Sequence, residues 1–243
     1  MQNQQPSTLK EIRVHGTQDF PCAFYQTGTR IRGNMVKHHW HEEVELLYFS
    51  GGEFCLEINM ERFEISEECF YFINPGELHS ISVEKNGGCV ENAVVFHMDM
   101  LSSAYALDQI QTNLIQPVQN GSIQFPRCLR KNEPAFEPVR KSYEEIRNVF
   151  GGDSFRENYY DGEAVTDDIT RQLFIKSTLL RILAVLSANN LFEVTEKNHD
   201  HRIETIKTTL TYIQENYKEK IYIRDLAGLI GMNEPVSYTH LTL

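Results

Sequence analysis

The feature that most constrains the fold is a change of hydrophobic period near residue 100. From about residue 22 to residue 97, apolar and polar side chains alternate, as in Phe54, Leu56 and Ile58. This period of two is typical of half-buried β-strands. Turn signals rich in Gly, Pro and Asn fall at 50–52, 74–76 and 86–88, and no helical pattern lies between them. The first part of the chain therefore predicts an antiparallel barrel or sandwich, not a parallel α/β sheet.

The later part of the chain has helical periodicity, with a Pro-containing interruption over 117–138. Helices are predicted near 137–150 and from about 167 to 190. The second helix carries two apolar stripes: Ile169, Leu173, Leu180 and Leu183, and Ile175, Leu179, Ile182 and Leu186. A helix that is apolar on two sides packs against two partners. One partner is the barrel; the other is a second subunit or the core of the same chain. We assign Leu179, Ile182 and Leu186 to dimerisation.

Three regions follow from these patterns. Residues 1–100 form an N-terminal arm and a barrel, and residues 101–198 form a helical connector and dimerisation region. A polar linker at 193–200 leads to a third amphipathic helix at 203–217 and a short helix at 224–230, within a last region of residues 199–243. The predicted fold class is therefore α+β, with an all-α C-terminal region.

Composition limits the function classes. The chain has 243 residues, and no apolar run approaches the roughly 18 residues of a membrane span. Its first ten residues lack the apolar centre of a signal peptide. We expect a cytoplasmic protein with no membrane partner. The five cysteines are scattered without a C-x-x-C pair, which favours free thiols. The net charge of −11 argues against coating nucleic acid by bulk electrostatics.

A histidine cluster is the sharpest local signal. His39, His41 and Glu45 have the same parity and so share one face of an extended strand, and His79 follows on a later strand. Two imidazoles and a carboxylate on one face suit Fe(II), Mn, Ni or Zn. Three interpretations stay open: a divalent metal site, polar groups that bind a small effector, or a structural polar cluster. We prefer the effector site, with no other cofactor.

The spacing of His39, His41 and Glu45 between Gly33 and Gly52 resembles the first motif of the cupin superfamily. The second motif matches less well, because Pro75 and Gly76 are adjacent. Together with HGTQDFP at 15–21, these motifs resemble the AraC/XylS family of transcription regulators. The resemblance implies a cupin-type double-stranded β-barrel (jelly roll) that binds a small effector, often a sugar. It also implies connector helices that dimerise and helix-turn-helix motifs that bind promoter DNA.

The C-terminal pattern supports this resemblance. Ala227 and Gly231 lie four residues apart, as in a helix-turn-helix, where a small residue lets two helices approach and a glycine permits the turn. Leu226 and Ile230 are expected to pack inward, and Arg224 is a candidate DNA contact. The chain then departs from the family pattern. Its tail VSYTHLTL at 236–243 offers only Ser237, Tyr238 and Thr239 as further DNA contacts, and we expect this tail to be non-native and the domain to be truncated.

Three functions compete. The first is an effector-responsive regulator that forms a homodimer and binds promoter DNA. The second is a metal-dependent cupin enzyme, such as a dioxygenase or sugar isomerase, which the long helical connector disfavours. The third is a shortened sensor that forms mixed dimers. We expect the regulator, and no catalytic residues.

Overall fold

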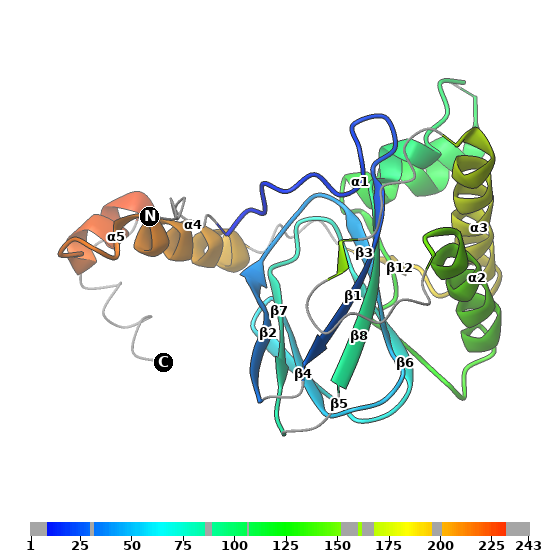
Figure 1. Cartoon of the computed structure of the whole chain (residues 1–243). Helices are drawn as coiled ribbons and strands as arrows, with labels where there is room; N and C mark the ends of the chain where they lie inside the picture. The colour runs from blue at the N-terminus through cyan, green and yellow to red at the C-terminus, as the bar shows by residue number, and fades with distance from the viewer. Residues whose placement is uncertain are drawn as a thin grey trace.

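The computed structural model describes residues 9–29, 32–85, 89–105, 107–151, 160–161, 168–195 and 201–231. Two antiparallel sheets lie face to face and form the cupin-type β-structure that the alternating pattern predicts (Figure 1). The six-stranded sheet has the order β10-β6-β3-β8-β1-β11, and the four-stranded sheet has the order β2-β7-β4-β5. The strands are β1 Cys22–Thr29, β2 Gly33–His39, β3 Val44–Phe49, β4 Phe54–Ile58, β5 Glu61–Ile65, β6 Cys69–Ile73, β7 His79–Val83, β8 Cys89–Phe96, β10 Cys128–Arg130 and β11 Tyr160–Asp161.

Four helices begin and end within about two residues of the predicted bounds: α2 Phe136–Val149, α3 Ile169–Ala188, α4 His201–Asn216 and α5 Ile223–Leu229. A further short helix, α1 Gln116–Gln119, lies at the start of the Pro-containing interruption, where no helix is predicted. Short helical turns η1 Met98–Leu101 and η2 Gln111–Ile115 precede α1, and β9 Ile123–Gln124 pairs with β12 Glu193–Val194. None of the described helices combines the length and apolarity that crossing a bilayer demands.

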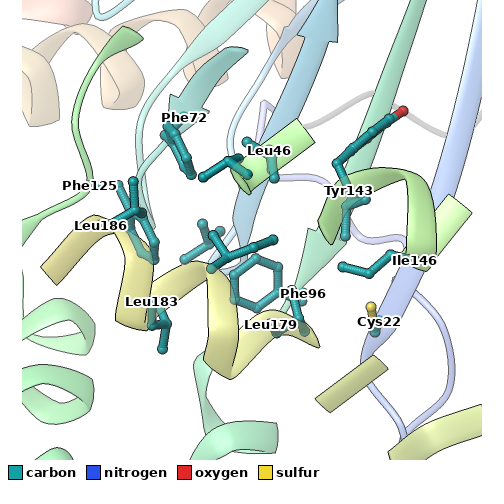
Figure 2. Packing of buried hydrophobic residues seen from close by; sticks show 14 of the residues in the cluster. Cys22, Leu46, Phe72, Phe96, Phe125, Tyr143, Ile146, Leu179, Leu183 and Leu186 are labelled. Atoms are coloured by element: carbon teal, nitrogen blue, oxygen red, sulfur yellow. The ribbon is translucent and has the colours of Figure 1, made fainter. Parts of the chain in front are cut away.

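Alternation along the strands creates two cores. Side chains on one face of the six-stranded sheet, such as Leu47 and Val95, meet the four-stranded sheet between the layers. Side chains of the opposite parity, such as Leu46 and Phe96, meet α2 and α3 on the outside. Figure 2 shows this second core, in which Leu179, Leu183 and Leu186 of α3 lie against strand residues. Because both faces of this sheet are covered, every residue of its strand β6 is buried.

The second core corrects the assignment of the dimer contacts. Leu179, Ile182 and Leu186 are almost completely buried within one chain, so they are unavailable to a second subunit. The exposed apolar side chains of α3 instead include Ile169 and Leu173. Periodicity identified both stripes but could not decide which of them faces the sheet.

The tight turn between β4 and β5 is hydrogen-bonded to Leu78, the residue just before β7. Asn59 and Met60 join β4 to β5 with φ of 50° and 71°. Two left-handed residues are typical of the turn whose twist suits a two-residue hairpin. The Asn59 backbone N–H donates to the Leu78 carbonyl at 2.7 Å, and its side-chain oxygen accepts from the Leu78 N–H at 3.1 Å. The hairpin therefore fixes the residue that precedes His79.

Candidate functional site

The four residues singled out in the sequence converge in the structure. His39 at the end of β2 is the register partner of His79 at the start of β7. Glu45 lies in β3, and His41 lies in the connection between β2 and β3. One side-chain nitrogen or oxygen from each of the four residues lies within 4.8 Å of those of the other three. The pairing of β2 with β7 therefore brings His79 to the three residues that the sequence spacing had grouped.

Each imidazole of this cluster is oriented by the backbone. Nδ1 of His39 lies 2.8 Å from the Lys37 carbonyl, and Nδ1 of His79 lies 2.9 Å from the Glu77 carbonyl. Nδ1 of His41 lies 3.2 Å from the Glu43 carbonyl. A carbonyl only accepts, so each Nδ1 carries the donated proton. In the neutral rings, Nε2 then presents a lone pair to the cluster.

Glu45 supplies the negative charge at the centre. Its Oε2 lies 3.4 Å from Nε2 of His41 and 3.0 Å from Nε2 of His79. Burial opposes ionisation of Glu45, but its interactions with His41 and His79 outweigh this and hold the pKa of the carboxyl well below its ordinary value. Burial and the neighbouring His79 lower the pKa of His39 to about 4. The site therefore combines a carboxylate with at least one neutral imidazole at neutral pH.

The turn before His79 is held by a partly buried ion pair between Glu77 and Arg127. Glu77 Oε2 accepts from the Asn74 backbone N–H and from Nη1 of Arg127, each at 2.7 Å. Nη1 of Arg127 also donates to the Phe72 carbonyl at 3.0 Å. Asn74 Oδ1 in turn accepts from the Phe125 N–H at 2.8 Å. These contacts fix the Glu77 carbonyl that orients the His79 ring.

The sequence interpretation missed two residues of the N-terminal segment, residues 9–21. Glu11 Oε2 lies 3.4 Å from Nε2 of His39 and 3.4 Å from Nε2 of His15. Glu11, His15 and His41 form a second group whose nitrogen and oxygen atoms lie within 4.8 Å of one another. The available signal was the spacing of Glu11 and His15, four residues apart, in which His15 is the first residue of HGTQDFP. This spacing alone could not predict the contact with the cluster, because nothing in the nearby sequence shows that the segment folds back onto the barrel.

The predicted helix-turn-helix scaffold residues lie in α5 and directly after it. Leu226 and Ala227 are buried, Ile230 is partly buried, and Gly231 follows with φ of 67°. Arg224 is exposed, and its guanidinium lies 4.7 Å from the Tyr222 ring. The proposed DNA contacts Ser237, Tyr238 and Thr239 lie outside the described residues.

Comparison with known proteins gives the family. The model of the AraC-like ligand-binding domain matches residues 24–147, more than half of the chain. The chain belongs to the AraC family. The HTH-type transcriptional regulator YdeC of Bacillus subtilis (strain 168), itself uncharacterized, is 26% identical to this AraC-family chain over 240 residues, covering 95% of the chain and 74% of YdeC.

Solved structures that are partly similar to this chain include the following two. Unsaturated-fatty-acid-bound ToxT from Vibrio cholerae strain SCE256 has a TM-score of 0.39 and 10% identity, covering 93% of this chain and 74% of ToxT. A predicted oxalate decarboxylase from Thermotoga maritima has a TM-score of 0.29 and 26% identity, covering 31% of this chain and 67% of that protein.

The cupin fold implies a divalent metal at a cluster of this kind, and the donor set fits one. Metal-binding histidines characteristically donate their second ring N–H to a carbonyl or carboxylate, as all three cluster histidines do here. Nε2 of His79 makes no hydrogen bond to any described residue, although it is fully buried beside Glu45. Three imidazole nitrogens and a carboxylate suit first-row divalent transition metals. A bound ion would act as a Lewis acid at this position.

Proposed function

We propose that this AraC-family transcription regulator responds to an effector bound at His39, His41, Glu45 and His79. DNA binding is proposed for the helix-turn-helix region that contains α4 and α5. The donors of the cluster are oriented and largely buried, which supports a ligand site. The family membership supports a sensor in preference to an enzyme, although cupin enzymes use a similar set of residue types.

The observation that carries this proposal is the position of Trp40. Its neighbours in the chain, His39 and His41, both belong to the cluster. Nζ of Lys207 in α4 lies 4.6 Å from the centre of the Trp40 ring, and Nζ of Lys10 lies 5.0 Å from it. A cation over an indole contributes about 0.5–2 kcal/mol, with the larger values in desolvated positions. The Lys207 side chain is only 10% exposed, so this contact belongs to the stronger class.

This arrangement gives an effector a route to the C-terminal helices. An effector shifts a conformational equilibrium only if it binds the two states with different affinity. Ligand contacts that reposition His39 and His41 also reposition the backbone of Trp40 between them. The Lys207 contact then differs between the ligand-free and ligand-bound states, and this difference provides the coupling energy.

We also propose that the regulator is a homodimer. The exposed apolar side chains of α3 include Ile169, Leu173 and Phe174. They lie away from the buried stripe and are the surface that we assign to the second copy of the chain. Large apolar side chains exposed on one helix are characteristic of an association surface.

The experiment uses Trp40, the single tryptophan of the chain, as an intrinsic probe. Sugars, organic acids and divalent metal ions are screened by Trp40 fluorescence, and hydrogen exchange in α4 is then measured with each ligand that binds. We expect a ligand to change exchange in α4 of the wild type but not of Lys207→Met. Lys10→Met is the matched control, because it removes a cation from the same ring but outside α4.

Two results would contradict the proposal. A ligand that binds the cluster, as judged by its loss in Glu45→Gln, but leaves exchange in α4 unchanged would contradict the coupling. Conversion of the bound compound to a product, detected by mass spectrometry, would favour the metal-dependent enzyme instead.

A further inference from the structure

Strands β6 and β10 bring two cysteines together from distant parts of the chain. Cys69 is the register partner of Arg130, and Tyr71 is the register partner of Cys128. Residues two apart on a strand share a face, so these four side chains form one block in which the cysteines are diagonal neighbours. The Cys69 thiol donates a hydrogen bond to the sulfur of Cys128. Both cysteines are free, so the structure holds them as a reduced pair.

The surroundings of Cys128 favour its thiolate. Besides Cys69, the Tyr71 hydroxyl and the Arg130 guanidinium donate hydrogen bonds to its sulfur. These interactions, with the bond from Cys69 contributing most, outweigh burial and lower the pKa of the thiol to about 7. Neighbouring cations and partial exposure are typical of reactive cysteines. Cys128 is therefore substantially ionised at neutral pH.

Exposure separates Cys128 from the other cysteines whose side chains the structure describes. Cys128 is partly exposed, whereas Cys22, Cys55 and Cys69 are buried. Burial also raises the pKa of Cys22, which keeps that thiol protonated. Since the thiolate is the nucleophile, a small oxidant in the solvent meets a reactive sulfur at Cys128.

Cys69 is the thiol of the pair and is placed to react second. Its hydrogen bond to Cys128, followed by its burial, raises the pKa of Cys69. Oxidation of Cys128 removes the thiolate that holds the Cys69 proton. Cys69 therefore becomes a nucleophile only after the first step, which is the order that a resolving cysteine requires.

We propose that Cys128 is an oxidation site for hydrogen peroxide, with Cys69 as its resolving cysteine. The Cys128 thiolate attacks one peroxide oxygen: the S–O bond forms, the O–O bond breaks, and the leaving hydroxide takes up a proton to become water. The sulfur is oxidised by two electrons to a sulfenic acid, and the peroxide is reduced. Cys69 then attacks this sulfur: the S–S bond forms, the S–O bond breaks, and the hydroxide leaves with the Cys69 proton as a second water.

The disulfide would move the edge of the six-stranded sheet. Diagonal neighbours on antiparallel strands have Cα atoms about 7–8 Å apart, whereas a disulfide joins Cα atoms about 4.4–6.8 Å apart. Closing the bond therefore draws β10 toward β6, and β10 is a three-residue edge strand with little to hold it. Arg127, just before Cys128, binds the Phe72 carbonyl and Glu77. Oxidation at β10 thereby reaches the turn that precedes His79.

The test follows each cysteine separately. The intact chain is reduced, freed of reductant and treated with hydrogen peroxide. Remaining thiols are blocked with N-ethylmaleimide, and peptide mass spectrometry assigns the state of every cysteine. We expect a disulfide between Cys69 and Cys128 that dithiothreitol reverses. In Cys69→Ala the reaction stops at the sulfenic acid, and dimedone labels Cys128. Hydrogen exchange over residues 74–78 should differ between the reduced and oxidised wild type but not in Cys69→Ala.

Two matched pairs of variants serve as controls. Cys55→Ala truncates another buried cysteine and should leave the disulfide of the wild type unchanged. Arg130→Gln and Lys131→Gln each remove one cation, but Lys131 contacts Glu68 instead of the cysteines, at 2.7 Å. Arg130→Gln should raise the pH midpoint of the oxidation rate by roughly one unit, and Lys131→Gln should not. Circular dichroism of every variant separates lost reactivity from lost fold.

Each part of the inference has an outcome that would overturn it. Both thiols surviving peroxide treatment would exclude the site. A disulfide from Cys128 to any other cysteine, Cys89 included, would exclude the role of Cys69. Equal pH midpoints in Arg130→Gln and the wild type would show that the block does not stabilise the thiolate. Unchanged exchange over residues 74–78 in the oxidised chain would exclude the effect on the turn. None of these results depends on the ligand of the histidine cluster.

Discussion

The ion pair behind His79 gives the most quantitative prediction. Glu77→Gln keeps the size of the side chain but leaves the Arg127 guanidinium without its charged partner. Breaking a fully buried pair costs about 3–5 kcal/mol. The Glu77 side chain is 8% exposed, whereas the Arg127 side chain is 29% exposed and keeps some water. We therefore expect a loss of about 3 kcal/mol, which lowers the Tm of a chain of this size by roughly 6–12 °C.

Thermal and urea denaturation measure this loss. Glu53→Gln is the control, because Glu53 contacts Lys85 at a similar distance of 2.7 Å but both side chains are largely exposed. The control should change the free energy of unfolding by about 0–1 kcal/mol. Adding Arg127→Met to Glu77→Gln should restore part of the stability, because no unpaired charge is then buried. If Glu77→Gln is as stable as Glu53→Gln, the argument from burial is wrong.

Three further predictions follow from burial and charge. Leu173→Glu should dissociate the proposed dimer in analytical ultracentrifugation with the fold intact, whereas Leu179→Glu should unfold the chain, because Leu173 is 62% exposed and Leu179 is 1% exposed; a folded Leu179→Glu monomer would contradict this. Burial raises the pKa of Glu91 well above 4.5, so its carboxyl destabilises the fold increasingly as pH rises above that value. Glu91→Gln should therefore gain stability relative to the wild type as the pH rises from 5 to 8 in urea denaturation, and a constant difference across that range would refute this. A hydrogen bond from Cys69 lowers the pKa of Cys128 to about 7, against burial; iodoacetamide should accordingly alkylate Cys128 with a pH midpoint near that value, and a midpoint near 9 would exclude the effect.

Periodicity predicted the elements better than their partners. The alternating pattern predicted the strands. The bounds of the four predicted helices agree with the observed bounds to within about two residues, because the apolar spacing of these helices spans several turns. It could not predict β10, which is three residues long and joins β6 far from it in the sequence. It also could not decide which stripe of α3 faces the sheet, since both stripes have the same spacing and similar residues.

The same limit separates the site residues that the sequence predicted from those it missed. His39, His41 and Glu45 were found because an extended chain puts residues of equal parity on one face. Glu11 reaches His39 and His41 through the turn at Gly16 and the backbone pairing with Trp40, which no local period encodes.

Trp40 lies between His39 and His41 in the chain, and its side chain points to the opposite side from theirs. Successive side chains of an extended chain point to opposite sides. His39 and His41 therefore face the carboxylates of Glu11 and Glu45, and the indole between them faces the amines of Lys10 and Lys207. A ligand that draws the two imidazoles toward one point must change the backbone direction at the intervening residue. In the proposed mechanism, sensing and transmission would need no long chain of contacts, because one tripeptide would carry both.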